Sequence, residues 1–309
     1  MAQPTRGISL TGVIMVMIAT FSLPVGAALA TDLFPHGGAW GVSALRLGLA
    51  SNMLLLLARP TPWRWTGAAW RDVVLFGVSL AGMNGFFYAA IDRIPLGVTV
   101  AIQFVGPLAL AVYLSTNRRD YIWIGAAGIG LVLLGVESLT GSMVFDPVGM
   151  LFAGLAGVSW ALYILFSSRV GRHLPGLEGL PVAALIAAIV LLPVGFSGVV
   201  ELVFTPEIYW LMLAVAFIST VVPTSFELAA LRRLPRNTFS ILLSLEPVFA
   251  ALIGWVLLDQ TFGVLRTLAI FLIIGATIGM TVGAAQLSSE VVEQRRARQR
   301  GDEDADGAS

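Results

Sequence analysis

Ten apolar stretches, each about 17 to 25 residues long, divide this chain and limit its fold more than any other feature. About 20 residues of α-helix cross a hydrocarbon layer about 30 Å thick, because a helix rises about 1.5 Å per residue. Inside that layer the backbone must satisfy its own hydrogen bonds, which a helix does within one segment. We place the spans near residues 8–30, 39–58, 72–91, 95–115, 121–137, 147–169, 179–200, 207–231, 236–258 and 263–286. The sequence therefore predicts an all-α integral membrane protein with ten transmembrane helices.

Charged side chains are scarce, and their positions orient the predicted bundle. They make up 12% of the chain, against about 25% in an ordinary soluble domain, and all 18 basic residues are arginine. With a cytoplasmic N-terminus, fifteen of these arginines fall on the cytoplasmic side, at Arg6, Arg59, Arg64, Arg71, Arg118, Arg119, Arg169, Arg172, Arg232, Arg233, Arg236, Arg295, Arg296, Arg298 and Arg300. Arg93 and Arg266 fall on the opposite side, and Arg46 falls within a span. The positive-inside rule thus predicts that both termini are cytoplasmic.

The first span also has features of a secretory signal peptide. Arg6 precedes an apolar stretch that contains Ala28, Leu29 and Ala30, which imitate a small-residue cleavage site. However, the stretch is longer than the about 7 to 15 residues of a signal core. Its removal would leave an odd number of spans and no explanation for the arginine asymmetry, so we expect it to remain as a transmembrane helix.

Missing residue types exclude several chemistries. The chain has no lysine for a GxxxxGK[ST] phosphate loop or a Schiff base, and no cysteine for disulfides, thiolate metal sites or redox chemistry. His36 and His173 fall in loops predicted on opposite sides of the membrane, so they cannot share a metal ion. We therefore expect no metal, no cofactor and no enzyme activity. A membrane enzyme or a scaffold is the alternative from another class, although the spans offer no histidine, lysine or cysteine as nucleophile or base.

The two halves of the chain repeat each other weakly. An offset of 140 residues superimposes AAIDRIP (89–95) on AALRRLP (229–235). Five helices per half is an odd number, so the second half would insert upside down relative to the first, as in many secondary transporters. We therefore expect one five-helix repeat at residues 8–137, a second at 147–286, and a disordered cytoplasmic tail at 287–309.

The segment SLEPVFAALIGWVLLDQ (244–260) places Glu246 and Pro247 in the middle of an apolar span. An acidic residue at the bilayer centre costs about 2.5 to 3.5 kcal/mol, so it persists where a cavity, a partner or a proton relieves the charge. Pro247 removes one backbone donor and would kink the helix. We interpret Glu246 as a candidate for substrate binding and proton coupling and Pro247 as a gate. The alternative is a protonated side chain that bonds a neighbouring helix.

Two further ionisable residues lie within predicted spans. Glu227 follows Pro223 by four residues, so carboxylate and kink share a helix face, and we assign them the same roles as Glu246 and Pro247. The alternative for Glu227 is a structural ion pair with Arg232 or Arg233. Arg46 lies about 10 Å from the outer end of its span. Its guanidinium can either extend outward to the interface or grip a substrate carboxylate with two hydrogen bonds.

Neutral polar and aromatic side chains extend the candidate site. Gln103, four residues before a predicted kink at Pro107, offers a hydrogen-bond donor and acceptor at membrane depth. Its alternative role is a hydrogen bond between helices. Two pairs on helix faces are further candidates for the cavity wall, with helix packing as the alternative: Asn84 with Tyr88, and Trp160 with Tyr163.

Gly275, Gly279 and Gly283 form two overlapping GxxxG patterns in the last span. Glycine at this spacing lets helices approach closely, which indicates either packing within the bundle or a homodimer face. Membrane lipid is an expected partner, and nucleic acid is not.

Several segments resemble the drug/metabolite transporter superfamily with paired EamA-type domains. The resemblance rests on ALRLGL (44–49), LEPVFAALIGWVLLDQ (245–260) and the five-plus-five plan, and it covers about residues 8–286. Other segments are similar to the threonine/homoserine exporter branch of that superfamily: DRIPLGVTVAIQFVGPLALAV (92–112), WALYIL (160–165) and VPTSFELAALRRLPRNTFSILLSLEP (222–247).

The resemblance implies a bacterial inner-membrane exporter that expels small neutral amino acids in exchange for protons, with Arg46, Glu227 and Glu246 at recurrent polar positions. The chain departs from the branch at Gln103, where glutamate is expected, and at residues 259–260, where Asp-Gln replaces Gly-Glu. A neutral Gln103 removes one titratable group, which can change the substrate or the proton stoichiometry.

With the amino-acid cargo that the resemblance implies, these residues give the hypothesis of a site for a zwitterion. The substrate carboxylate would meet Arg46 and its ammonium would meet Glu246 or Glu227, so that each buried charge is compensated. Proton coupling follows if one glutamate binds either substrate or proton but not both. Rocking of one repeat against the other would expose the site to each side in turn. A nucleobase or a drug-like amphiphile is the alternative cargo.

Overall fold

The computed structural model describes residues 9–114, 120–139, 146–175, 177–231, 233–234, 236–243, 245–260, 263–265, 267–276 and 278–279. Most of these residues are helical, and none of them lies in a β-strand. The elements are α1 (Leu10–Thr31), α2 (Phe34–Ala58), η1 (Pro62–Arg64), α3 (Gly67–Ile91), α4 (Leu96–Leu114), α5 (Asp120–Leu139), α6 (Pro147–His173), α7 (Gly179–Phe204), α8 (Pro206–Ala216), η2 (Phe217–Val221), α9 (Val222–Leu231), α10 (Arg236–Leu243) and α11 (Glu246–Leu258).

Several of these helices are suited to a membrane. In the described part of the chain, six segments are long and apolar enough to cross one: Leu10–Thr31, Phe34–Ala58, Gly67–Ile91, Pro147–His173, Gly179–Phe204 and Pro206–Glu227. Three shorter apolar helices are Leu96–Leu110, Val248–Leu258 and Thr267–Ala276. The chain is therefore a helical membrane protein with several spans, and the count of ten remains a prediction.

The predicted span at 207–231 contains a π-helical turn. α8 ends at Ala216, η2 is the π-helical segment, and α9 follows it. The Val222 N–H bonds to the carbonyl of Phe217, five residues earlier, immediately before Pro223. Because proline has no N–H and its ring crowds the preceding turn, it accounts for the local change from α to π geometry.

The predicted span at 236–258 consists of two helices. α10 ends at Leu243, and α11 begins at Glu246 with Pro247 in its first two positions. Proline suits the first turn of a helix, where the N–H that it lacks would have no partner. The chain thus restarts its helix at the acidic residue in the middle of the apolar stretch.

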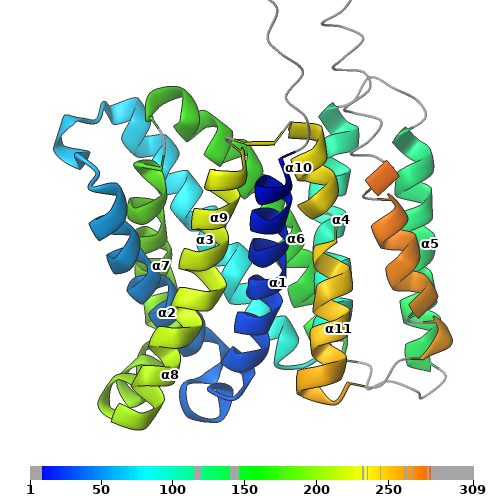
Figure 1. The fold of residues 1–309 in the computed structure, drawn as a ribbon. Coiled ribbons are helices and arrows are strands. Elements are labelled where there is room, and N and C mark those ends of the chain that lie inside the picture. Colours follow the sequence, from blue (N-terminus) through cyan, green and yellow to red (C-terminus); the bar gives the residue numbers. More distant parts are fainter. Residues whose placement is uncertain are drawn as a thin grey trace, which may run out of the picture.

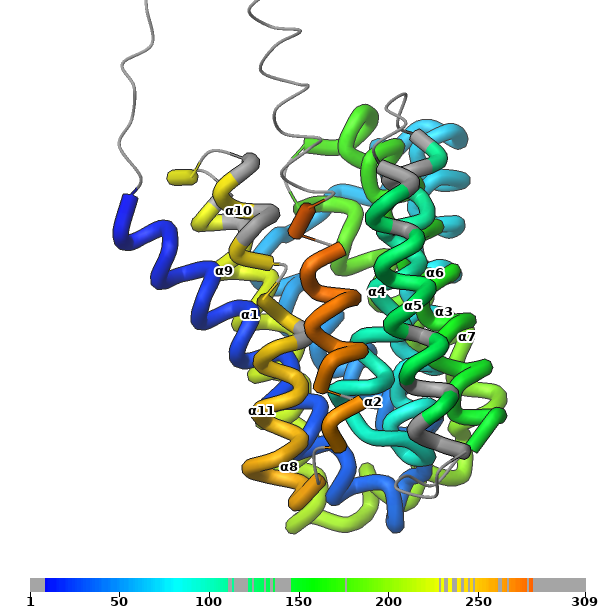
Figure 2. The backbone as a smooth tube through the Cα atoms, turned by 90° about the vertical axis from the view of Figure 1, so that its right-hand side faces the viewer, coloured from blue at the N-terminus to red at the C-terminus, as the bar shows by residue number. Residues whose placement is uncertain are grey.

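The helices pack in two groups (Figures 1 and 2). In one group α2 packs along α7, and α3 and α4 pack against α6. In the other, α1 packs against α9 and α11, and α11 also contacts α4, which connects the groups. Two crossings in the first group require glycine. A Cβ at Gly198 would lie 1.9 Å from the carbonyl oxygen of Gly37, and a Cβ at Gly106 would lie 1.9 Å from that of Gly157.

The glycine pattern near the C-terminus is only partly described. A Cβ at Gly279 would lie 2.4 Å from the ring of Trp123 on α5, whereas a Cβ at Gly275 would meet nothing within 4 Å. Gly283 and the predicted tail at 287–309 lie outside the described residues. Gly279 therefore contributes to packing within the bundle.

Arginine-rich connections gather at one end of the molecule. The start of α1, the α2–α3 connection and the α6–α7 connection lie at the top of Figure 1, whereas the α1–α2 connection and the start of α8 lie at the bottom. The top end contains Arg59 at the end of α2, Arg64 in η1 and Arg172 in the last turn of α6. The charge asymmetry of the sequence is therefore also an asymmetry of the fold.

Candidate functional site: a polar cavity within the bundle

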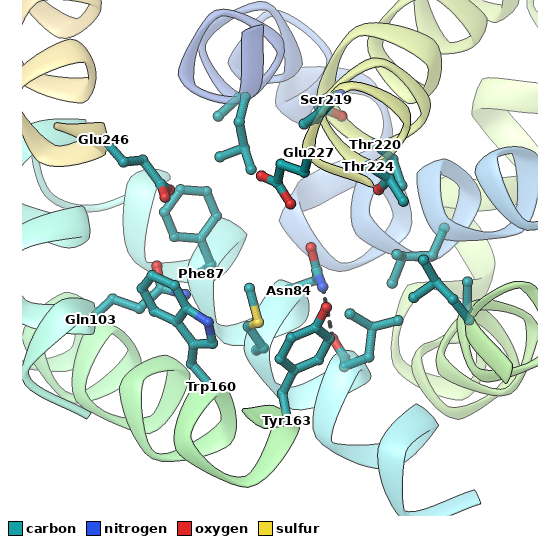
Figure 3. Close-up of a pocket in the computed structure, with 18 of the residues that line it drawn as sticks. Asn84, Phe87, Gln103, Trp160, Tyr163, Ser219, Thr220, Thr224, Glu227 and Glu246 are labelled. Carbon is teal, nitrogen blue, oxygen red and sulfur yellow. Dashed lines mark hydrogen bonds between the residues drawn. The ribbon is translucent and has the colours of Figure 1, made fainter. Parts of the chain in front are cut away.

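A cavity of about 610 Å³ lies among the helices of both groups. All eight polar and aromatic residues selected from the sequence line it: Arg46, Asn84, Tyr88, Gln103, Trp160, Tyr163, Glu227 and Glu246. Pro107 and Pro223 also line the cavity. Pro247 lies beside it in the chain, one residue after Glu246 at the start of α11. Residues far apart in the sequence are thus brought to one place, as Figure 3 shows for the labelled side chains.

Arg46, on α2, is buried but is held by neutral groups. Its residue is 5% exposed. Nη1 donates hydrogen bonds to Ser219 Oγ and Thr220 Oγ1, both at 3.0 Å, and Nη2 donates to Asn84 Oδ1. The guanidinium also lies 4.8 Å from the centre of the Tyr88 ring, a cation–π contact. Its Nε–H has no partner, and no carboxylate in the described part of the chain forms an ion pair with it.

The π-helical turn explains how two hydroxyls reach the guanidinium. Ser219 and Thr220 are consecutive residues of η2, the turn that precedes Pro223. Ser219 Oγ in turn donates a 2.6 Å hydrogen bond to the carbonyl of Val215, which fixes its orientation. A buried arginine with three oxygen partners and no counter-ion is partly satisfied but not neutralised. It is therefore suited to receive an anion.

Ser219, Thr220 and Thr224 also line the cavity, although the sequence pattern did not single them out. Hydroxyl residues are common in membrane helices because they can bond to their own backbone, so none of them stands out alone. The spacing of the two threonines relative to Glu227 could have identified them. Thr220, Thr224 and Glu227 follow one another at intervals of four and three residues, which places them on one helix face.

The two acidic residues enter the cavity from different helices. Glu227 comes from α9 and Glu246 from the first position of α11. In Figure 3 the Glu227 carboxylate lies toward Asn84 and Tyr163, and Glu246 lies on the side of Phe87. Both residues line the same cavity. Neither forms an ion pair with a described arginine. Of the two predicted alternative partners of Glu227, Arg233 instead donates to the carbonyl of Ala229 at 2.8 Å, and Arg232 lies outside the described residues.

The cavity reaches toward the arginine-rich end and is closed at the other. Its lining includes Leu54 near the end of α2, Leu177 in the α6–α7 connection and Leu180 on α7. Toward the opposite end, beyond Tyr88, buried apolar side chains fill the space between the helices. They include Ala30, Leu33, Ile91, Ile94 and Leu202.

A polar contact reinforces the closed end. Arg93 Nη1 lies 3.0 Å from Asp146 Oδ2, while Asp146 Oδ1 accepts hydrogen bonds from the N–H groups of Val148 and Gly149 at the start of α6. The Gly149 hydrogen bond, followed by the one from Arg93, lowers the pKa of the Asp146 carboxyl below its ordinary value. The α3–α4 connection is thereby tied to the first turn of α6.

A helical membrane protein whose central cavity contains ionisable side chains has the architecture of a transporter. Comparison with known proteins identifies the transporter family to which the chain belongs. The chain belongs to the EamA-like transporter family, whose family model matches residues 147–282. It is thus a member of a family of transporters, not of enzymes.

Two relatives show how far the similarity extends. The chain is 39% identical to the threonine/homoserine exporter RhtA of Escherichia coli K12 and 40% identical to RhtA of Salmonella typhimurium LT2. Each match extends over 270 residues, 87% of this chain and 91% of the relative. A crystal structure of a protein with 21% identity superposes with a TM-score of 0.57 over 89% of this chain and 98% of that chain, which supports the fold alone.

Proposed function

We propose that this protein is a secondary exporter of small neutral amino acids, such as threonine and homoserine, in the bacterial inner membrane. The observation that carries the proposal is the buried Arg46 guanidinium, which shares a cavity with Glu227 and Glu246 but pairs with no carboxylate of the described chain. A zwitterionic substrate supplies the missing charge at each end. The exporters to which the chain is about 40% identical support the same cargo.

In this proposal the substrate carboxylate binds the Arg46 guanidinium and the ammonium binds Glu227 or Glu246. Guanidinium and carboxylate form charge-assisted hydrogen bonds, which are about twice as strong as neutral ones. The carboxylate therefore competes well with the hydroxyls of Ser219 and Thr220 for the same N–H groups. The apolar and aromatic remainder of the wall excludes water and strengthens these contacts.

Proton antiport follows from the same geometry. A glutamate that binds the substrate ammonium must be ionised, and it can take up a proton once the substrate has left. Because Glu227 and Glu246 line one cavity, a proton on one carboxyl would favour the charge on the other. Substrate and proton would thus occupy the site alternately, and the proton gradient would drive export.

The proposed architecture is ten transmembrane helices in two inverted repeats, residues 8–137 and 147–286, with both termini in the cytoplasm. Helix pairing supports it. If α8–α9 form the eighth span and α10–α11 the ninth, the contact of α3 with α6 has its counterpart in that of α9 with α1. The contact of α4 with α6 likewise corresponds to that of α11 with α1. Alternating access would then arise from rocking of these two groups.

Efflux of labelled threonine and homoserine from cells that lack their own exporters tests the function. We expect the wild type to release both amino acids, less so with an uncoupler, and Arg46→Gln to release neither. Arg64→Gln, which changes an arginine of η1 outside the cavity, is the matched control and should export normally. A well-expressed wild type that moves neither amino acid would contradict the proposal and favour a nucleobase or an amphiphile as cargo.

A further inference from the structure

Gln103 offers an unused amide inside the cavity. The residue is 5% exposed and lines the cavity, yet no hydrogen bond joins its side chain to another residue in the described ranges. A glutamine amide can accept through its oxygen and donate through its two N–H groups. Because Gln103 lines the cavity, its amide atoms are available to a molecule bound there. A polar group on a bound ligand can therefore hydrogen-bond to this amide.

The backbone at Gln103 is closely packed. Pro107 has no N–H, so the carbonyl of Gln103 lacks its usual helical partner four residues later. That carbonyl lies against Gly157 of α6, where an added Cβ would be 2.7 Å from the Gln103 oxygen. Next to it, Phe104 and Trp160 pack edge to face with ring centres 4.6 Å apart. The Gln103 side chain is therefore attached to the backbone where α4 and α6 pack closely against each other.

The polar groups of the cavity are arranged so that they could contact the carboxylate, the ammonium and the side chain of one amino acid. In Figure 3, Ser219 and Thr220, which bond to Arg46, lie on one side, and Gln103 and Trp160 lie on the other. Glu227 lies between them. The carboxylate and ammonium of an amino acid are attached to the same carbon. A substrate with its carboxylate at Arg46 and its ammonium at Glu227 would direct its side chain toward Gln103.

We infer that Gln103 selects the substrate by hydrogen-bonding to a hydroxyl on its side chain, while Trp160 packs against the apolar part of that side chain. The inference rests on the proposed function. A hydroxyl can both donate to Oε1 and accept from Nε2. Valine has nearly the shape of threonine, with a methyl group in place of the hydroxyl, so its binding would leave the amide unpaired. Sites that use such hydrogen bonds discriminate strongly against the analogue that lacks the hydroxyl.

Transport of labelled threonine and valine by purified protein in proteoliposomes tests this assignment. For the wild type we expect kcat/KM for threonine to exceed that for valine by about tenfold or more. Gln103→Leu should lose this preference, because threonine transport falls while valine transport stays equal or rises. Asn52→Leu is the matched control. It also replaces an amide with an apolar side chain, but at an exposed position where Asn52 bonds the carbonyl of Gly48, and it should leave both rates unchanged.

The outcomes separate this inference from the proposed function. Equal wild-type rates for threonine and valine, or an equal loss of both in Gln103→Leu, would overturn the role of Gln103 and leave amino-acid export intact. A wild type that carries neither would overturn the export proposal and this inference with it. If Gln103→Leu aggregates during purification, Gln103→Met, which is also apolar but unbranched, replaces it in the test. The ratio of kcat/KM for threonine to kcat/KM for valine in the wild type tests the preference without any variant.

Discussion

At the scale of single residues, the environment of Arg46 is the most informative feature. Hydrogen bonds to charged groups contribute about 1.5 to 3 kcal/mol each, so Asn84, Ser219 and Thr220 offset much of the cost of burial. They do not supply opposite charge. The hydrogen bonds stabilise the buried guanidinium before substrate binds, and an anion bound beside it would add a favourable electrostatic interaction. A site that binds and releases its substrate reversibly requires this combination.

Arg46→Lys should not preserve function, although it preserves charge. Lysine is a point charge and cannot bond to Asn84 on one side and to Ser219 and Thr220 on the other as the planar guanidinium does. We expect kcat/KM for threonine to fall by at least about tenfold, the factor that corresponds to 1.4 kcal/mol. Full activity of a well-folded Arg46→Lys protein would show that charge alone suffices.

Glu246→Gln should separate transport from proton coupling. The amide cannot ionise, so we expect net efflux that no longer responds to an uncoupler, or no net efflux, while exchange of labelled for unlabelled threonine continues. Glu201→Gln is the control, because Glu201 lies on α7 3.5 Å from His36 and does not line the cavity. Unchanged, uncoupler-sensitive efflux in Glu246→Gln would assign this residue a structural role.

At the scale of elements, interruptions of helix position the site. The π-helical turn η2 presents Ser219 and Thr220, and the restart of α11 presents Glu246. Prolines stand at both interruptions and at Pro107 within α4. Such positions are tolerated in a membrane where the freed backbone groups are enclosed by protein or line a cavity.

Pro223→Ala tests whether the π-helical turn matters. Alanine restores the N–H and permits regular α-helix, which would rotate Ser219 and Thr220 relative to Arg46. We expect threonine transport to fall by about tenfold while thermal stability is unchanged or higher, since the substitution also removes a helix breaker. Transport at the wild-type rate would mean that the hydroxyls can reach Arg46 from a regular helix.

The stability of the protein should depend on pH through Asp146, which lies outside the predicted spans. Its pKa in the fold lies below its ordinary value, so its stabilising effect is complete above the ordinary value of 3.8 and is lost as the pH falls toward the lowered value. We expect Asp146→Asn to lower the melting temperature of the detergent-solubilised protein at pH 7. In acid, the melting temperatures of the variant and the wild type should become more similar. A difference that is constant with pH would contradict this.

Much of this could be predicted from sequence, for identifiable reasons. Polar residues such as Gln103 and Glu246 stand out against an apolar background, and the structure gathers all eight selected residues around one cavity. What could not be predicted depends on contacts between distant segments. Ser219 and Thr220 reach Arg46 only because η2 packs beside α2. Pro247 predicts a kink in its span, but not that α10 ends at Leu243 and a separate helix begins at Glu246.

At the scale of the whole molecule, the cavity reaches toward the arginine-rich end and is closed at the other. In the proposed orientation this is a state open to the cytoplasm. The chain contains no cysteine, so single cysteines can report which side reaches the cavity. We expect Leu177→Cys to react with a membrane-impermeant maleimide applied from the cytoplasmic side, and Leu33→Cys, buried at the closed end, to react from neither side. Labelling of Leu177→Cys from the periplasmic side alone would reverse the orientation.

The most direct measurement of the central claim uses purified protein in proteoliposomes with an imposed pH gradient. If threonine and protons exchange through the site that contains Arg46 and Glu246, vesicles that are acidic inside will accumulate labelled threonine. Accumulation will stop when an ionophore collapses the gradient and will be absent in Arg46→Gln. Threonine uptake by the wild type that is indifferent to the gradient would contradict proton antiport, and the absence of any threonine uptake or exchange would contradict the account as a whole.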